Sequence, residues 1–151
     1  MTTLLVTTGS RGDVQPFLAL AHGLADAGHP ALVAAPRRFA ELAARVGVDF
    51  VGLDDSLFAL QDELVGAGAR AAFTGVSRAR PYLRRWLDDL ARLVDVGADA
   101  VVFTQKTLGG RSLAEKLGVP ALPAQLIPLT PPTAAFAHPI APASTPAVLA
   151  R

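Results

Sequence analysis

The polar residues best suited to chemistry lie in one early loop, residues 9–16, which follows the first apolar run of the chain. Asp13 carries a carboxylate that can accept a proton from an attacking hydroxyl, whereas Ser10 is too weak a base and Arg11 stays protonated. A second interpretation of Asp13 stays open. A carboxylate at a helix start also caps the helix, and the helix N-terminus weakens it as a base.

Two glycines, Gly9 and Gly12, flank Ser10 and Arg11 in this loop. No Gly-Lys-Ser/Thr follows, and the Gly-x-Gly-x-x-Gly spacing is missing, so the loop predicts neither a P-loop nor an NAD site. An Arg-Gly-Asp adhesion role would need an exposed extracellular loop, and no secretory signal is visible in the sequence. The structural interpretation is that both glycines only permit a tight turn between a strand and a helix.

Composition and charge exclude several classes of protein. The chain has 151 residues, a formal charge of +1, 51% hydrophobic residues and no cysteine. This length predicts one domain with a substantial core, and the charge gives no general attraction to nucleic acid. No His, Cys or carboxylate cluster has the spacing of metal ligands, so no metal is expected. No apolar run is long enough to span a membrane, and we expect a cytoplasmic protein.

Alternating β-type and helical patterns predict an α/β fold, a Rossmann-like doubly wound parallel sheet in the strand order 3-2-1-4-5. Pro16 is expected to open the first helix, and the region between the third and fourth strands predicts two helices broken near 66–68 and Gly75. The strands are expected over 4–8, 31–35, 48–53, 98–104 and 119–122, and the clearer helices over 17–27, 39–46, 81–96 and 112–117.

This strand order places the switch point between the first and fourth strands, where open α/β sheets bind ligands. The loops 9–15 and 105–110 should therefore face each other, which brings Gln105 close to Asp13. Residues 104–107, which open the second of these loops, contain no acid. The strand residues Leu5, Val33, Phe50 and Val102 should be buried.

Two further stretches are less regular. Tyr82 and Trp86 alternate with arginines, a pattern that fits either a surface for lipid or anionic ligand, or a solvated helix face with Trp86 turned inward. Beyond residue 125 the sequence is rich in Pro, Ala, Ser and Thr. We therefore divide the chain into a Rossmann-like domain, residues 1–127, and a Pro-rich loop or tail, residues 128–151.

Three separated motifs resemble one family. They are Gly-Ser-Arg-Gly-Asp-Val-Gln-Pro-Phe at 9–17, Ala-Glu-Lys-Leu-Gly-Val-Pro at 114–120 and Pro-Leu-Thr-Pro-Pro-Thr at 128–133. In this order they resemble the N-terminal half of the two-domain (GT-B) glycosyltransferases that act on sterols, macrolides and glycopeptide antibiotics. The resemblance covers essentially the whole chain.

The resemblance implies an inverting transfer of sugar from a nucleotide-diphosphate sugar to a hydroxyl of a hydrophobic acceptor. Asp13 has the position of the general base, and the residues near donor or acceptor are implied to be Gly9, Ser10, Arg11, Gly12 and Gln105. The acceptor pocket is implied to include Leu57, Phe58, Tyr82, Pro128, Thr130 and Phe136.

The resemblance also implies the partners of this domain. No cofactor is expected, because a UDP- or TDP-sugar would be a co-substrate held mainly by a C-terminal donor-binding domain that lies outside these 151 residues. Contact with a membrane surface would follow if the acceptor is a lipid. The alternative is a non-catalytic module that binds a small molecule or pairs with another protein.

Overall fold

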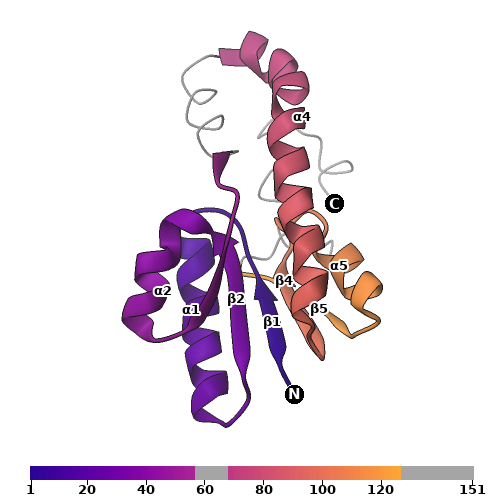
Figure 1. The fold of residues 1–151 in the computed structure, drawn as a ribbon. Coiled ribbons are helices and arrows are strands. Elements are labelled where there is room, and N and C mark those ends of the chain that lie inside the picture. Colours follow the sequence, from indigo (N-terminus) through magenta and orange to yellow (C-terminus); the bar gives the residue numbers. More distant parts are fainter. Residues whose placement is uncertain (57–67, 127–151) are drawn as a thin grey trace, which may run out of the picture.

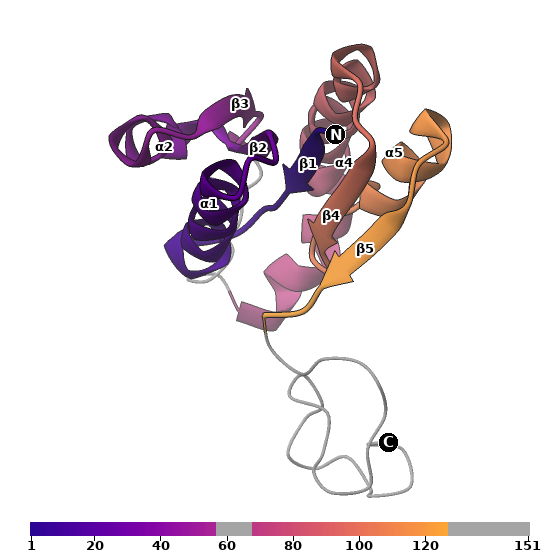
Figure 2. The same ribbon diagram turned by 90° about the horizontal axis from the view of Figure 1, so that it is seen from below.

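The computed structural model describes residues 1–56 and 68–126, which form a parallel five-stranded sheet in the order β3-β2-β1-β4-β5 with helices on both faces (Figures 1 and 2). This confirms the predicted fold class and strand order. The strands are β1 (Thr3–Val6), β2 (Ala31–Pro36), β3 (Asp49–Leu53), β4 (Ala100–Thr104) and β5 (Ala121–Ala124), and the helices are α1 (Arg11–Asp26), η1 (Arg37–Phe39), α2 (Ala40–Val46), α4 (Gly68–Arg92), η2 (Leu93–Val96) and α5 (Gly110–Leu117).

Strand β1 lies at the centre and pairs in parallel with β2 on one side and β4 on the other. Successive side chains of a strand point to opposite faces of the sheet, which gives β1 two cores. Leu4 and Val6 pack on the face covered by α4 and α5, whereas Leu5 packs with Phe17 of α1 and Val33 of β2 on the other face. All three β1 leucine and valine side chains are fully buried.

The first helix begins earlier than predicted. We expected Pro16 to open it, but α1 begins at Arg11, so Pro16 lies inside the helix. Ser10 and Asp13 form a capping box, which satisfies backbone N–H groups of the first turn and stabilises a helix start at this point. Pro16 cannot donate to the carbonyl of Gly12, but both residues are exposed, so water can bond that carbonyl at little cost.

The long helix α4 also differs from the prediction. It is continuous through Gly75 and Pro81, and its first part extends past the carboxyl edge of the sheet (Figure 1). Two hydrogen bonds hold the second half of α4 against the rest of the domain. The buried Trp86 donates from Nε1 to the carbonyl of Leu108 at 3.0 Å, and Asp89 accepts a 2.7 Å hydrogen bond from the backbone of Asp54. Trp86 therefore turns inward, as one of the two interpretations of this stretch predicted.

Burial follows the prediction on β1 and β2 and departs from it on β3 and β4. Leu5 and Val33 are fully buried, but Phe50 and Val102 are only partly buried. Phe50 lies on β3, the edge strand on one side of the sheet. The partner of Val102 on β5 is Leu122, whose side chain is 51% exposed on the other edge strand, so this end of the sheet is thinly covered.

A close contact between Gly110 and Phe103 holds α5 against the sheet. A Cβ at Gly110 would lie 2.6 Å from Cγ of Phe103, which is closer than real side chains approach. We expect Gly110→Ala to lower the free energy of unfolding by about 1–3 kcal/mol, because α5 or the Phe103 ring must move. Urea denaturation measures this change.

The matched control is Gly23→Ala on the exposed face of α1, where an added Cβ meets no atom within 4 Å. It should stabilise the protein by about 0.5–1 kcal/mol, because alanine is the better helix residue. Equal effects of the two substitutions would contradict the packing argument.

Candidate functional site

The first loop of the site is built around the carboxylate of Asp13. Ser10 donates to Oδ2 of Asp13 twice, from its backbone N–H at 2.8 Å and from its hydroxyl at 3.1 Å. Gly9 makes this approach possible, since its φ is +122° and a Cβ there would collide with the Asp13 carboxylate. The buried hydroxyl of Thr7 donates to the Asp13 carbonyl at 3.1 Å, which ties the first turn of α1 to the end of β1.

The second loop is a tight turn after β4. The backbone N–H of Thr107 donates to the Thr104 carbonyl at 2.9 Å, and the two threonine hydroxyls are bonded at 2.9 Å. The Thr107 hydroxyl also lies 3.3 Å from the carbonyl of Val6 on β1. These contacts fix the turn against the central strand, so the position from which Lys106 projects is well determined.

An ion pair joins the two loops. Nζ of Lys106 lies 2.7 Å from Oδ1 of Asp13, across 93 positions of sequence. The lysine side chain is 46% exposed, whereas that of the aspartate is only 12% exposed. The loops therefore meet at the switch point, as predicted.

Lys106 is a residue that the sequence reasoning missed. Residues 104–107 hold no carboxylate that could assist Asp13, and the structure places the cation of Lys106 beside it instead. One signal was present in the sequence. The chain has 14 basic residues, of which only Lys106 and Lys116 are lysines, and Lys106 stands directly after the strand that neighbours β1.

These contacts set the protonation of Asp13. Burial acts to raise its pKa, but the hydrogen bond from Lys106, the two bonds from Ser10 and the charge of Lys106 together outweigh burial. The pKa of Asp13 therefore lies below its ordinary value of 3.8. The group is an ionised carboxylate at neutral pH and a weaker base than a free aspartate.

Asp13 and Lys106 line a pocket of about 280 Å³ at the carboxyl edge of the sheet. Four of the sequence-predicted residues are in its wall, namely Ser10, Gly12, Asp13 and Gln105, together with Thr104, Lys106, Ala124 and Leu126. Gly9 supports Asp13 but does not line the pocket. Arg11 also lies outside the wall, because its exposed side chain turns along α1 and donates to Gln15 at 3.1 Å.

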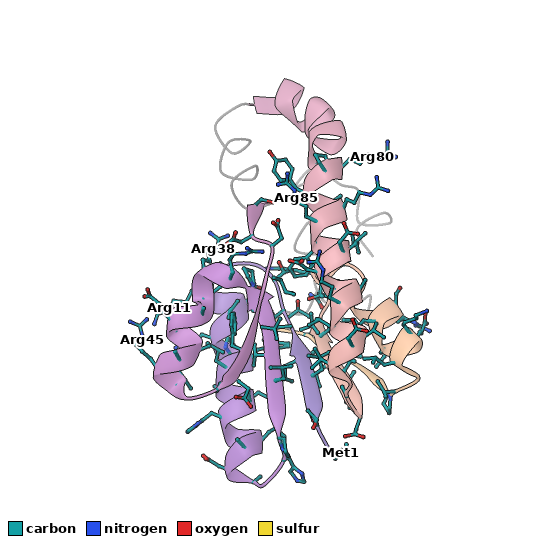
Figure 3. The ribbon with its side chains drawn as sticks, in the orientation of Figure 1. Met1, Arg11, Arg38, Arg45, Arg80 and Arg85 are labelled. Carbon is teal, nitrogen blue, oxygen red and sulfur yellow. The ribbon has the colours of Figure 1, made fainter. Side chains whose placement is uncertain are left out.

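The residues proposed for an acceptor pocket are mostly not described. Leu57, Phe58, Pro128, Thr130 and Phe136 lie outside the described residues. Tyr82 is half-buried on α4, with the guanidinium of Arg85 5.9 Å from the centre of its ring. It lines neither the pocket of Asp13 nor the pocket between α4, η2 and α5 that is described next. Figure 3 shows Arg85 and Arg80 on the part of α4 that extends past the carboxyl edge, at the end opposite to Met1. An acceptor role for Tyr82 stays a prediction.

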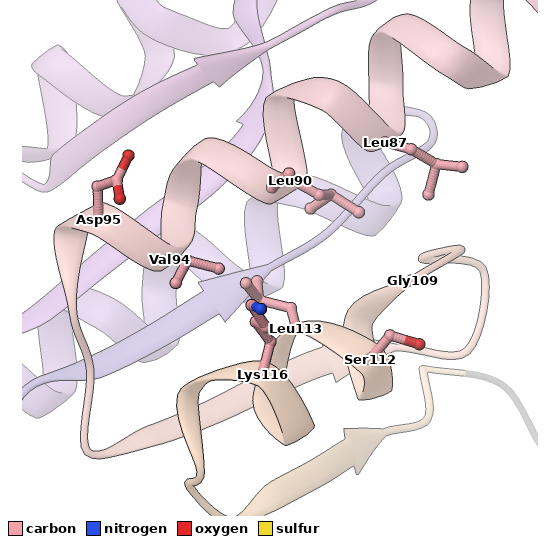
Figure 4. A pocket seen from close by; sticks show the side chains of 9 residues that line it. Leu87, Leu90, Val94, Asp95, Gly109, Ser112, Leu113 and Lys116 are labelled. Carbon is pink, nitrogen blue, oxygen red and sulfur yellow. The ribbon is translucent and has the colours of Figure 1, made fainter.

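A larger pocket of about 460 Å³ lies away from Asp13, between α4, η2 and α5. Figure 4 shows Leu87, Leu90 and Val94 on one side of it and Leu113 of α5 on the other. Neither the loop of Asp13 nor the turn of Lys106 contributes to its lining. Asp13 and Lys106 therefore belong to the smaller pocket alone.

Residues 1–56 and 68–126 contain no group of three His, Cys, Asp or Glu side chains able to hold a metal ion. Across the described residues, no helix is both long and apolar enough to cross a membrane.

A parallel sheet with a carboxylate loop at its switch point defines a ligand-binding α/β domain. The model of the glycosyltransferase family 28 N-terminal domain matches residues 3–136. This chain therefore belongs to glycosyltransferase family 28, and the match covers its N-terminal domain.

Two kinds of relatives agree with this assignment. The sterol 3-beta-glucosyltransferase of Leptosphaeria maculans is 32% identical over 141 residues, covering 91% of this chain and 10% of that protein. The glycosyltransferase GtfE of Amycolatopsis orientalis is 36% identical, covering 92% of this chain and 34% of that protein. The chain thus spans between about a tenth and about a third of the length of these relatives.

Solved structures share the fold. The calicheamicin glycosyltransferase CalG4 has a TM-score of 0.65 at 22% identity, covering 82% of this chain and 32% of that one. The glycosyltransferase SsfS6 of Streptomyces sp. SF2575 has a TM-score of 0.61 at 23% identity, covering 83% of this chain and 39% of that one. The parallel sheet described above is therefore that of the N-terminal domain of GT-B glycosyltransferases.

The ion pair makes stability depend on pH. The folded-state pKa of Asp13 is depressed, so its contribution to stability is present above the ordinary value near 3.8 and is lost as the pH falls through the folded-state pKa. We expect Asp13→Asn to lower the free energy of unfolding by about 1 kcal/mol at pH 7 and by less at pH 3. Urea denaturation at both pH values measures the difference.

Asp26→Asn is the matched control at the other end of α1. Asp26 is 71% exposed and pairs only with His22, at 3.6 Å, among the described residues. Its substitution should change stability little at either pH. A loss for Asp13→Asn that is the same at pH 7 and pH 3 would show that the charge of Asp13 contributes nothing.

Proposed function

We propose that this chain is the acceptor-binding half of an inverting glycosyltransferase, which moves a sugar from a nucleotide-diphosphate sugar to a hydroxyl of a hydrophobic small molecule. The observation that carries the proposal is the ionised, buried Asp13 carboxylate in the wall of the switch-point pocket. Family membership supports the reaction class. Cytoplasmic localisation stays a prediction.

In the proposed reaction, the acceptor hydroxyl gives its proton to Oδ1 of Asp13 while its oxygen attacks the anomeric carbon. The bond from that carbon to the diphosphate oxygen breaks, and the leaving diphosphate takes the electron pair. Attack from the face opposite the leaving group inverts the anomeric centre. Asp13 needs to act only as a proton acceptor, and Ser10 keeps its carboxylate in one orientation through Oδ2.

The pocket volume indicates which part of the acceptor lies here. At about 280 Å³ the pocket is slightly below the usual range of small-molecule sites, roughly 300–1,000 Å³. It is suited to the reacting end of an acceptor rather than to a whole sterol or macrocycle. The remaining walls would come from residues such as Leu57, Phe58 and Phe136, which only the family resemblance assigns to the acceptor pocket.

Solved structures of similar proteins support the substrate classes. SsfS6 has been solved in complex with thymidine diphosphate, and the spinosyn rhamnosyltransferase SpnG with thymidine diphosphate and with spinosyn aglycone. By analogy, we propose that a TDP- or UDP-sugar serves this protein and that a second, C-terminal domain binds it. If the acceptor is a lipid, the carboxyl edge of the sheet would face the membrane surface.

Asp13→Asn tests the base in the full-length protein. The substitution keeps the size and most of the capping role of the side chain while removing its basicity, so kcat should fall by about 10²–10⁴ with little change in acceptor affinity. Product formation from a nucleotide sugar and a sterol or macrolide acceptor is measured by mass spectrometry, with Asp26→Asn as the control. Turnover per folded molecule near that of the wild type would mean that Asp13 is a structural cap.

The second test uses the 151-residue chain alone. We expect it to fold and to transfer no sugar, because holding donor and acceptor together supplies up to about 7–11 kcal/mol that one domain cannot provide. The measurement is the same product assay with and without a donor-binding domain. Transfer by the chain alone would contradict the proposal, and its absence in the full-length protein as well would favour the binding-module alternative.

A further inference from the structure

The proposed reaction leaves one charged group of the site without a role, the ammonium of Lys106. It lies in the wall of the pocket, 2.7 Å from Oδ1 of Asp13. The other residues lining the pocket are uncharged apart from Asp13 itself. Arg11, which lies two positions before Asp13, is exposed and bonded to Gln15 instead.

The two oxygens of Asp13 are used differently. Oδ2 accepts both hydrogen bonds from Ser10, a neighbour on the same loop, and these bonds fix the carboxylate in its place. Oδ1 accepts only from Lys106 among the bonds found in the described residues. Oδ1 is therefore the oxygen available to a hydroxyl proton, and Lys106 competes for that oxygen.

Competition from Lys106 limits the ability of Asp13 to accept a proton. While the ammonium stays on Oδ1, protonation of that oxygen would end the charge-assisted hydrogen bond from Lys106, so the ammonium lowers the affinity of Asp13 for a proton. Asp13 would become an effective proton acceptor only once the ammonium has moved to another anion.

We propose that Lys106 is a positioning residue. Before the donor binds, its ammonium holds Oδ1 of Asp13, and when the donor binds, the ammonium moves to an anionic oxygen of the donor's diphosphate. This inference rests on the proposed function for the identity of the anion. It adds to that function a residue that couples donor binding to the base.

The geometry of Lys106 suits such a transfer. Its backbone lies in the turn that hydrogen bonds between Thr104 and Thr107 hold in place. The side chain can therefore move while the backbone of the loop stays fixed. The side chain is 46% exposed, and ion pairs with that much solvent contribute little net stability, so exchanging one anion for another costs little. An ammonium on a flexible stem is a point charge that can change partners, whereas arginine would hold a carboxylate with two parallel bonds.

The proton and charge balance of the step is complete. With Lys106 on the diphosphate, the acceptor hydroxyl transfers its proton to Oδ1, and its oxygen forms the new bond to the anomeric carbon. The bond from that carbon to the diphosphate breaks, and the departing oxygen keeps the electron pair. The charge of Lys106 then offsets the negative charge that develops on the leaving group.

The test follows the titration of Asp13 by NMR in the whole protein labelled with ¹³C-aspartate, with the Asp13 signal assigned by its loss in Asp13→Asn. The probe is inorganic pyrophosphate, compared with sodium chloride at the same ionic strength. In the wild type, pyrophosphate should raise the pKa of Asp13, because the ammonium leaves Oδ1. No change in that pKa would overturn the proposal.

Lys106→Met separates the movement of the ammonium from the direct effect of the anion. The pKa of Asp13 should already be raised in this variant without pyrophosphate, and pyrophosphate should move it much less than in the wild type. Lys116→Met is the matched control, since Lys116 lines the other pocket, and it should titrate as the wild type does. An equal response to pyrophosphate in Lys106→Met and the wild type would show that the anion acts through its own charge, and the proposal would be wrong.

The readout does not depend on transfer activity. If the protein transfers no sugar but Asp13 responds to pyrophosphate only when Lys106 is present, the proposed function fails and the coupling stands. If transfer occurs and the pKa of Asp13 does not respond, the reverse holds. Lys106→Gln provides the same comparison should Lys106→Met aggregate.

Discussion

The pairing of β1 on both of its edges is the constraint from which the rest of the structure follows. Leu4, Leu5 and Val6 have no exposed surface, so this strand must be covered by helices on both faces and by strands on both sides. The chain leaves β1 through α1 toward β2 and returns through α4 to β4 on the opposite side. The loops after β1 and β4 then run in different directions, and a crevice forms between them.

The crevice holds a carboxylate under two opposing demands. A largely buried charge is tolerated only with hydrogen-bond partners, and Asp13 has three of them from Ser10 and Lys106. The same partners stabilise the ionised form and so reduce the tendency of Asp13 to take a proton. The contacts that stabilise the domain without substrate therefore weaken Asp13 as a base. A substrate that changes the hydrogen-bond partners of Asp13 would remove this conflict.

The sequence predicted the sheet because the strands are short apolar runs separated by helical patterns, and a parallel sheet admits few strand orders. It also predicted that the loops carrying Asp13 and Gln105 face each other, since both loops follow neighbouring strands at the switch point. It was wrong about Pro16 and Gly75. Their local preference against a helix interior was outweighed by the capping box of Ser10 in one case and by the continuity of a helix anchored through Trp86 in the other.

Lys106 could not be assigned from local patterns, because its partner is 93 residues away and only the turn between Thr104 and Thr107 directs its side chain. The acceptor residues Leu57, Phe58, Pro128, Thr130 and Phe136 rest on the resemblance alone. Phe50 is partly buried because it lies on the edge strand β3, and Val102 is partly buried because it lies next to the edge strand β5. The predicted strand order already placed β3 and β5 at the edges, but a strand pattern does not reveal how thinly the helices cover those edges.

The contact between Gly110 and Phe103 has a consequence for how sequences of this family can diverge. The ring of Phe103 occupies the space that any side chain at position 110 would need. A lineage can therefore enlarge position 110 only after position 103 has become smaller, so the two sites should change together and in that order. Position 110 opens α5, directly after the loop that carries Lys106, so drift at this pair would also tilt the turn that faces Asp13.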